Sequence, residues 1–156
     1  MTVIGIPKGR LLNMKISTKG RYAIRMLVDL AMHGAGNYVA LKDIAERQNI
    51  SKKYLEQIVS LLNKSDILKA SRGFQGGYTL SKSPDRYTIG MILRITEGSL
   101  APVSCLEEMP NQCERSAMCS TLFVWQGLYD VINGYLDSIT LQDIIDRQTE
   151  GYNFSI

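Results

Sequence analysis

The segment Leu41-Lys-Asp-Ile-Ala-Glu-Arg-Gln-Asn-Ile-Ser-Lys-Lys-Tyr-Leu-Glu-Gln-Ile-Val-Ser-Leu-Leu-Asn63 predicts two short helices joined by a tight turn. Apolar residues of the first helix repeat at helical spacing and stop near Gln48. Ser51 is a preferred N-cap residue, so it opens the second helix. This arrangement is typical of a helix-turn-helix, whose second helix enters the major groove of DNA and leads with its N-terminal residues. The apolar positions of the second helix are Tyr54, Leu55, Ile58, Val59 and Leu62.

Elements on both sides of this pair predict a winged fold. A helix is expected over residues 17–33, ahead of the pair. Behind it, two short strands flank the glycine-rich stretch Arg72-Gly-Phe-Gln-Gly-Gly77, as in a β-hairpin wing. Thr88 then caps a helix that ends at Gly98. We therefore expect a mainly α protein with a small β-hairpin wing, a winged helix-turn-helix.

A seam of apolar residues marks the C-terminal part of the chain. One long amphipathic helix far from a small core would leave this seam in water, so we interpret it as a dimerisation helix. Packing within one subunit is the alternative. Thr140 and Asp143 form a capping-box pattern that opens a last helix. The seam consists of Leu122, Trp125, Leu128, Tyr129, Ile132, Tyr135, Leu136 and Ile139.

Four regions are expected along the chain. Residues 1–13 are an N-terminal extension, 14–98 a winged helix-turn-helix DNA-binding domain, 99–121 a cysteine loop, and 122–156 the dimerisation helix with a C-terminal helix.

Charge divides in a similar way. Residues 1–90 carry 15 Lys and Arg against 6 Asp and Glu, a balance of +9; residues 91–156 carry 3 against 9, a balance of −6, and the sum is +3. Only the basic part is expected to meet a polyanion such as nucleic acid. Scattered solvated lysines without a partner are the alternative.

No apolar run approaches the roughly 18 residues that a membrane span needs. The longest apolar patch in the first thirteen residues, Val3-Ile-Gly-Ile6, is too brief for a secretory signal. We expect a cytoplasmic protein with no membrane partner.

The three cysteines of the chain, Cys105, Cys113 and Cys119, fall within fifteen residues that have no sustained apolar period. In a cytoplasmic protein such a cluster indicates metal binding or redox sensing more often than a disulfide. Three thiolates with one weak or open position suit an iron-sulfur cluster. Structural zinc and reactive thiols without metal are the alternatives.

The polar face of the second helix of the pair suits the reading of DNA bases. Gln57 offers a donor and an acceptor together and can pair with adenine, and Glu56 can accept from a cytosine amine. Lys and Ser side chains serve phosphates or base edges. In the wing, Arg72 precedes glycines that allow close approach to a narrow groove, although Gly76-Gly77 can equally serve only the turn. The polar face holds Ser51, Lys52, Lys53, Glu56, Gln57, Ser60 and Asn63.

Four segments of the chain carry a resemblance to a known family. They cover almost everything after Asn13, and together they are highly specific. They are similar to the Rrf-two (Rrf2) family of bacterial transcriptional regulators, which are winged helix-turn-helix homodimers joined by a long C-terminal helix. The segments are Met14-Lys-Ile-Ser-Thr-Lys-Gly-Arg-Tyr-Ala23, Asp43-Ile-Ala-Glu-Arg-Gln-Asn-Ile-Ser-Lys-Lys-Tyr-Leu-Glu-Gln-Ile58, Arg72-Gly-Phe-Gln-Gly-Gly-Tyr-Thr-Leu80 and Glu97-Gly-Ser-Leu-Ala-Pro-Val103.

The resemblance implies DNA contacts at two places. The wing position that enters the minor groove is occupied here by Arg72 and Gly73. The ring of Tyr54 can belong to the core while its hydroxyl reaches a phosphate. The family's recognition-helix contacts correspond to Ser51, Lys53, Tyr54, Glu56 and Gln57.

The resemblance also implies an iron-sulfur cluster at the cysteine loop, with [2Fe-2S] expected in preference to [4Fe-4S]. The spacing here is C-x7-C-x5-C, whereas cluster-binding relatives have C-x5-C-x5-C and a histidine three residues later, where this chain has Leu122. Some relatives use an aspartate of the first helix instead, but the aligned residue is Arg21. The fourth ligand is therefore unknown; the candidates are Glu107, Glu108, Glu114, a loop serine or a small molecule.

These patterns predict a sequence-specific regulator of transcription that binds double-stranded DNA as a homodimer, is controlled by the cluster, and is not an enzyme. The alternative is a cluster-free regulator of the same fold, controlled by zinc, thiol oxidation or a protein partner such as an enzyme or a cluster-assembly protein. An electron-transfer role is disfavoured because it leaves the winged domain unexplained.

Overall fold

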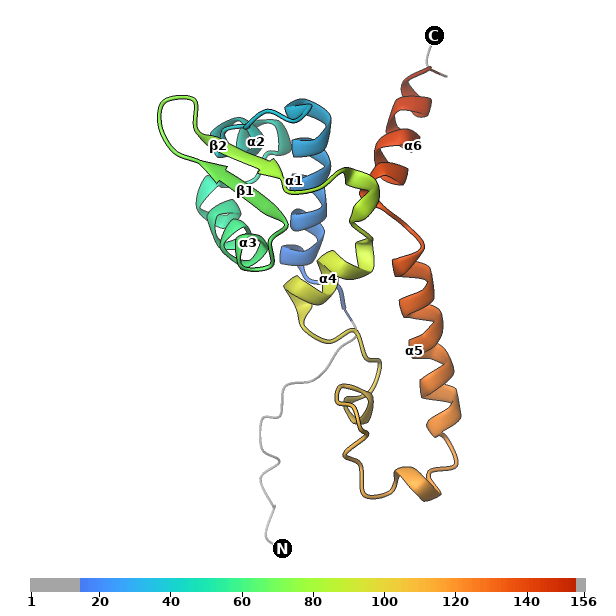
Figure 1. The fold of residues 1–156 in the computed structure, drawn as a ribbon. Helices are drawn as coiled ribbons and strands as arrows, with labels where there is room; N and C mark the ends of the chain where they lie inside the picture. The colour runs from blue at the N-terminus through green and yellow to red at the C-terminus, as the bar shows by residue number, and fades with distance from the viewer. Residues whose placement is uncertain (1–14, 154–156) are drawn as a thin grey trace, which may run out of the picture.

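The computed structural model describes residues 15–153, with side chains up to residue 151, so the extension predicted at residues 1–13 lies outside the described residues. Helices pack around a small antiparallel hairpin, and a C-terminal arm stands beside them (Figure 1). The elements are α1 (Thr18–Gly34), α2 (Leu41–Gln48), α3 (Lys52–Lys64), β1 (Leu68–Ser71), β2 (Gly77–Leu80), α4 (Ile89–Glu97), α5 (Leu122–Asp137) and α6 (Leu141–Asn153). This arrangement confirms the predicted mainly α fold with a hairpin wing.

Side-chain caps set the starts of three helices. The hydroxyls of Ser17, Ser51 and Thr88 each accept an N–H bond from the third residue of the helix that follows. Asn49 ends α2 in the left-handed region, with φ of 52°. This conformation makes the tight turn between α2 and α3.

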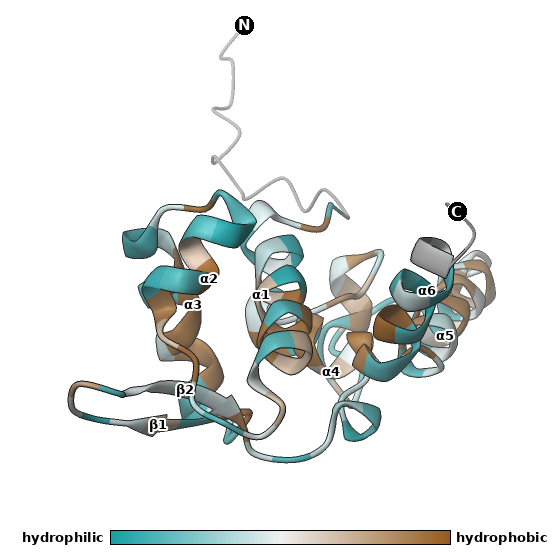
Figure 2. Cartoon of the chain, turned by 90° about the horizontal axis from the view of Figure 1, so that it is seen from above, coloured by the Kyte–Doolittle hydropathy of each residue, from teal (hydrophilic) through white to brown (hydrophobic). Residues whose placement is uncertain are grey.

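One hydrophobic core joins the four N-terminal helices. The hydrophobic stretches of α2 and α3 lie on the sides that face α1, and polar residues cover the outside (Figure 2). Leu141, the first residue of α6, is also fully buried in this core. The α6 helix therefore packs against the winged domain instead of continuing the arm. Other fully buried members are Met26, Leu27, Ile44, Leu55, Ile58, Leu62 and Ile92.

The wing is fixed at its base. Strands β1 and β2 pair in antiparallel register from Leu68 opposite Leu80 to Ser71 opposite Gly77. Tyr78 and Val39 exchange two backbone hydrogen bonds of 2.9 Å, which tie β2 to the loop before α2. A Cβ on Gly77 would lie 2.2 Å from the Val39 carbonyl oxygen, so only glycine allows this approach.

The predicted C-terminal seam does not form a single helix to its end. Helix α5 stops at Asp137, and the Ile139 carbonyl instead accepts the N–H of Ile89 at 2.8 Å. A latch holds this end of α5 to α4, because Arg94 donates to both carboxylate oxygens of Asp137 at 2.8 and 2.7 Å. The hydrogen bond from Arg94 lowers the pKa of Asp137. Gly90 makes room, since a Cβ there would lie 2.0 Å from Asp137 Oδ1.

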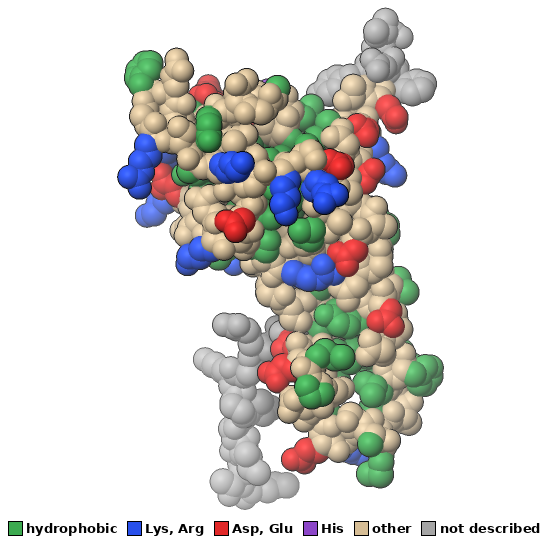
Figure 3. All heavy atoms as spheres, viewed as in Figure 1, with side chains coloured by type: hydrophobic (Ala, Val, Ile, Leu, Met, Phe, Trp, Pro, Cys, Tyr) green, Lys and Arg blue, Asp and Glu red, His purple; other side chains and the backbone are tan. Residues whose placement is uncertain are grey.

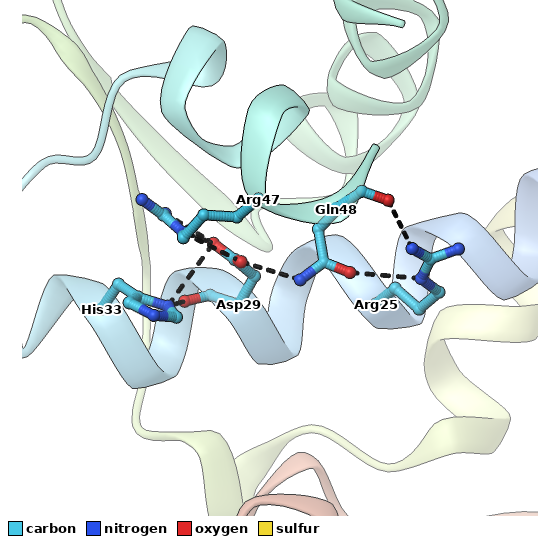
Figure 4. Close-up of polar contacts among 5 residues, drawn as sticks. All are labelled: Arg25, Asp29, His33, Arg47 and Gln48. Carbon is cyan, nitrogen blue, oxygen red and sulfur yellow. Dashed lines mark hydrogen bonds and ion pairs between the residues drawn. The ribbon is translucent and has the colours of Figure 1, made fainter. Parts of the chain in front are cut away.

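A buried carboxylate links α1 to the end of α2 (Figure 4). The Asp29 side chain is fully buried, and Arg47 donates to it from Nη2 at 2.6 Å and from Nε at 3.1 Å. Gln48 Nε2 donates to the second carboxylate oxygen at 2.8 Å, and both oxygens of Gln48 accept from Arg25. The His33 ring lies against the Asp29 carbonyl, with Nδ1 2.9 Å away.

This polar cluster of Arg25, Asp29, His33, Arg47 and Gln48 positions the start of α3. Arg47 and Gln48 are the last residues of α2, directly before the turn that leads to Ser51 and α3. A buried carboxylate is tolerated only where charged or polar donors satisfy it. The cluster therefore defines where α2 ends relative to α1, and with it the entry angle of α3.

We predict that Asp29→Asn lowers the free energy of unfolding by about 2 kcal/mol, because the amide leaves the Arg47 guanidinium poorly paired. The measurement is urea unfolding at a fixed protein concentration. The Glu46→Gln change, on the exposed side of the same helix, is the matched control and should leave stability nearly unaltered. Equal stability of the Asp29→Asn protein and the wild type would contradict the anchoring role.

Candidate nucleic-acid interface and cysteine loop

The N-terminal half of α3 presents a polar surface. Predicted contact residues Ser51, Lys52, Lys53, Glu56 and Gln57 are all exposed, while the apolar residues between them are buried. The Ser51 hydroxyl accepts the N–H of Tyr54 at 3.2 Å, so its own proton stays free to be donated. Lys52 and Glu56 form an ion pair of 3.8 Å that is open to water and therefore weak. Donors and acceptors for DNA thus gather on one helix face.

The aromatic ring of Tyr54 is a packing element. Tyr54 is half-buried and meets Tyr22 of α1 edge to face, with 5.7 Å between ring centres and 78° between planes. The Arg25 guanidinium lies 5.1 Å from the centre of the Tyr22 ring. Arg25 therefore joins the recognition helix to the polar cluster. Arg25 was not among the predicted site residues, because its bonds to Gln48 join positions distant in sequence.

The wing tip, residues 72–76, carries the second set of predicted contacts. Arg72 and Gly73 are exposed, and Gly73 has φ of +107°, a conformation that favours glycine. The Gly76 N–H donates to the Gly73 carbonyl at 3.0 Å and closes the turn. A Cβ on Gly76 would lie 2.5 Å from the Ser71 carbonyl oxygen. Gly76 and Gly77 thus shape the turn and its base, while Arg72 and Gly73 stand free.

Basic side chains gather on the winged domain. Figure 3 shows most visible Lys and Arg side chains over the upper lobe, which holds α1 to α4 and the wing. Hydrophobic and acidic side chains are prominent over the lower lobe, formed by the cysteine loop and α5. On this face, basic side chains are therefore concentrated on the winged domain, although the acidic side chains of α6 lie beside it.

The cysteine loop is at the opposite end of the molecule from the wing tip (Figure 1). It runs from the end of α4 to the start of α5 through two short 3₁₀ turns, Ser104–Leu106 and Ser116–Met118. All three thiols are free; Cys105 and Cys113 are half-buried, and Cys119 is exposed. Within residues 15–153, no three His, Cys, Asp or Glu side chains lie close enough together to hold a metal ion. The loop thus has soft donors of the right kind, but they are not gathered in this conformation.

Cys119 has the most distinctive environment of the three thiols. Its sulfur is 3.5 Å from Thr121 Oγ1, just before α5 begins. Hydrogen bonding to Thr121 lowers the pKa of the Cys119 thiol, and Arg115 contributes a smaller effect in the same direction. Leu122, where the resemblance implied a histidine, is the first residue of α5. The thiolate fraction of Cys119 is therefore larger than that of an ordinary cysteine thiol.

Helix α5 leaves an apolar face in water. None of its residues is buried. Val124, Leu128, Val131 and Tyr135 are spaced by three or four residues and share one face, with exposed fractions from 38% to 69%. A face of this size in a soluble chain indicates an interaction surface. In the described part of the chain, no helix is long and apolar enough to cross a membrane.

Comparison with known proteins agrees with this architecture. The family profile of Rrf2, described as an iron-dependent transcriptional regulator, matches residues 16–147. The HTH-type transcriptional regulator CymR of Bacillus subtilis is 42% identical over 148 residues, covering 92% of this chain and 100% of CymR. The solved structure of B. subtilis CymR, described as the global cysteine regulator, has a TM-score of 0.69 and 38% identity and covers 85% of this chain and 97% of that one.

A second solved structure connects the chain to the transcriptional regulators named IscR. The structure of T. potens IscR has a TM-score of 0.69 and 37% identity, covering 88% of this chain and 90% of its own. CymR and IscR are both regulators of transcription. The winged helix-turn-helix, the profile match and these relatives lead to one conclusion: the chain belongs to the Rrf2 family and is a DNA-binding transcriptional regulator, not an enzyme.

Proposed function

We propose that this chain is a cytoplasmic, homodimeric regulator that reads a specific operator through α3 and the wing and is controlled by an iron-sulfur cluster at Cys105, Cys113 and Cys119. The observation that carries the proposal is that one chain holds both a polar surface suited to DNA and a loop with three thiols. A polar reading surface lies on α3, and a three-thiol loop lies between α4 and α5. The latch from Arg94 to Asp137 connects these two helices.

The exposed face of α5 supports a dimer. Two copies of α5 crossing at this face would remove Val131 and Tyr135, now 69% and 65% exposed, from water. A two-fold axis through this contact would place two copies of α3 on one side of DNA. Dimeric helix-turn-helix proteins require half-sites about one helical turn apart, so the dimer contact fixes operator spacing.

We predict that Val131→Glu converts the dimer to a monomer, because a carboxylate on the apolar face of α5 would have to be buried unpaired. Sedimentation equilibrium gives the mass directly. The control is Thr149→Glu, which adds the same charge on the exposed side of α6 and should leave the mass unchanged. A Val131→Glu protein that is still dimeric would exclude α5 as the dimer contact.

The α3 surface makes separable contributions to affinity and to specificity. We predict that Lys53→Ala weakens binding to all DNA sequences and reduces the salt slope by about one, because one phosphate contact is lost. Gln57→Ala should cost roughly 1–3 kcal/mol on the operator and relax the preference at one base pair. Binding is measured by fluorescence anisotropy against salt, on an operator selected from random duplexes. Arg147→Ala, which removes a positive charge from α6, is the control and should change neither quantity much. A salt-independent affinity of the wild type would contradict DNA binding through this surface.

The chemistry of the loop supports the cluster. Thiolates are the usual protein ligands of iron-sulfur clusters, and the bound group would supply redox or oxygen sensitivity. Cys105, Cys113 and Cys119 would hold it, with a fourth ligand from Glu107, Glu108, Glu114, a loop serine or a small molecule. Because the three thiols are not gathered in this conformation, binding requires the loop to change shape. The change would reach α5 at its first residue, Leu122, which lies three positions after Cys119, while the ion pair of Arg94 with Asp137 holds the other end.

Thiol oxidation without a cluster is the second candidate control. The lowered pKa of Cys119 and the exposure of its sulfur favour reaction with oxidants. Similarity to the cysteine regulator CymR, as well as to IscR, keeps this candidate open. Zinc, or a protein partner such as an enzyme or a cluster-assembly protein, are further forms of cluster-free control.

One experiment separates these controls. We predict that anaerobic reconstitution with iron and sulfide gives a coloured protein with visible charge-transfer bands, [2Fe-2S] stoichiometry and a changed operator affinity. Cys113→Ser should be colourless, because one of three thiolates is lost, whereas Met118→Leu in the same loop should bind the cluster like the wild type. A colourless wild type whose DNA binding responds to peroxide and to Cys119→Ser would overturn the cluster and support thiol oxidation.

A further inference from the structure

We propose that Phe74, at the tip of the wing, is an apolar wedge that inserts between base pairs of the operator where the wing enters the minor groove. The inference rests on the proposed function, since it requires that the wing contacts DNA. It adds an apolar contact with DNA, which neither the polar side chains of α3 nor the charge of Arg72 can make.

The exposure of Phe74 sets it apart. Its accessible area is 105% of the reference value, so the whole ring is in water. The other large exposed hydrophobic residues of the winged domain, Ile16, Met32, Tyr38 and Met91, are between 39% and 42% exposed. Each of these still packs on one side, whereas Phe74 does not. Burial of such an apolar ring is favourable, and the isolated chain does not bury it.

The backbone of the hairpin leaves the Phe74 ring exposed at the tip and anchors the base of the wing to the rest of the domain. Gly73 has φ of +107°, and a Cβ there would meet nothing within 4 Å, so the space directly beside Phe74 is open at Gly73. At the base, the 2.9 Å bonds between Val39 and Tyr78 and the close approach of Gly77 hold the hairpin to the body. The tip is therefore narrow and unobstructed, and the ring lies at its end.

The residues beside Phe74 suit DNA better than a protein. Residues 71–83 contain Arg72 and Lys82 and no Asp or Glu, so no carboxylate on the hairpin repels phosphate. A protein-binding site needs a contiguous apolar patch, whereas the sequence neighbours of this ring, Arg72, Gly73 and Gln75, add no apolar side chain to it. Proteins of the minor groove use this combination, in which cations hold the backbone while an apolar side chain partly unstacks one base step.

The wedge gives the wing a specificity of its own. Unstacking is easiest at flexible pyrimidine–purine steps such as TA and CA/TG. The operator should therefore contain such a step under each wing, although no polar group reads its bases. Insertion should also bend the duplex.

The test uses the full-length dimer and duplexes selected from a random pool with the wild type. 2-Aminopurine is placed in turn at adenines across the half-site, and bending is followed by energy transfer between the duplex ends. We expect the wild type to raise the 2-aminopurine fluorescence at one pyrimidine–purine step and to bend the duplex. Phe74→Ala should lose both signals and about tenfold in affinity. Phe74→Trp, which keeps an aromatic ring, should retain all three.

Two further variants separate this inference from the proposed function. Arg72→Ala tests whether the wing contacts DNA at all, and Lys53→Ala tests α3. Weaker binding by Arg72→Ala with full affinity, bending and fluorescence for Phe74→Ala would overturn the wedge and leave the wing contact standing. If both wing variants bind like the wild type while Lys53→Ala is impaired, the wing contact and the wedge both fail. A Phe74→Ala protein that loses affinity while the wild type shows no fluorescence change would also exclude insertion.

Discussion

The buried carboxylate of Asp29 is the constraint on which the reading head depends. An ionised side chain with no exposed area is stable only because Arg47 and Gln48 supply donors from α2. The apolar core would tolerate several small slides of α2 along α1, because hydrophobic contact has no direction. Hydrogen bonds to a carboxylate require specific directions, so they select one placement. Because the turn at Asn49 directly follows α2, the placement of α2 also sets the position of the first residues of α3.

A second set of polar contacts links the reading head to the cysteine loop. The backbone N–H and hydroxyl of Ser17 both donate to Glu97, so the start of α1 is tied to the end of α4, where the loop begins. Arg94 of α4 also donates hydrogen bonds to Asp137 and Asn133 of α5. Hydrogen bonds thus tie α4 to α1 and to α5, the elements on either side of the loop. The loop itself makes few contacts with the rest of the molecule. A change in the loop therefore acts on α5 against a fixed α4.

Local patterns were sufficient for much of the fold. Ser51 and Thr88 cap helices through their nearest neighbours, so residue type and spacing predicted those boundaries. Partners distant in sequence were not predictable in this way. Asp29 gave no sign of its bonds to Arg47, and the end of α5 at Asp137 depends on a carbonyl of Ile139 that pairs with Ile89. A glycine inside the predicted helix at Gly90 was a usable signal, because it indicates a close neighbour. By contrast, the closeness of the three cysteines in sequence did not predict the distances between their sulfurs, which are not grouped for metal binding in the described residues.

The weak packing of the cysteine loop is consistent with a sensor. A ligand shifts a conformational equilibrium only by its difference in affinity for the two states. Rearranging a well-packed loop would break its packing contacts. Most of the free energy of ligand binding would then offset this cost instead of moving α5. Within the loop, Leu100 and Leu106 are buried, whereas Met109 and Met118 are 90% and 87% exposed. The exposed part of the loop can therefore rearrange without breaking core contacts, and under the proposed control the free energy of cluster binding or thiol oxidation would be available to move the start of α5.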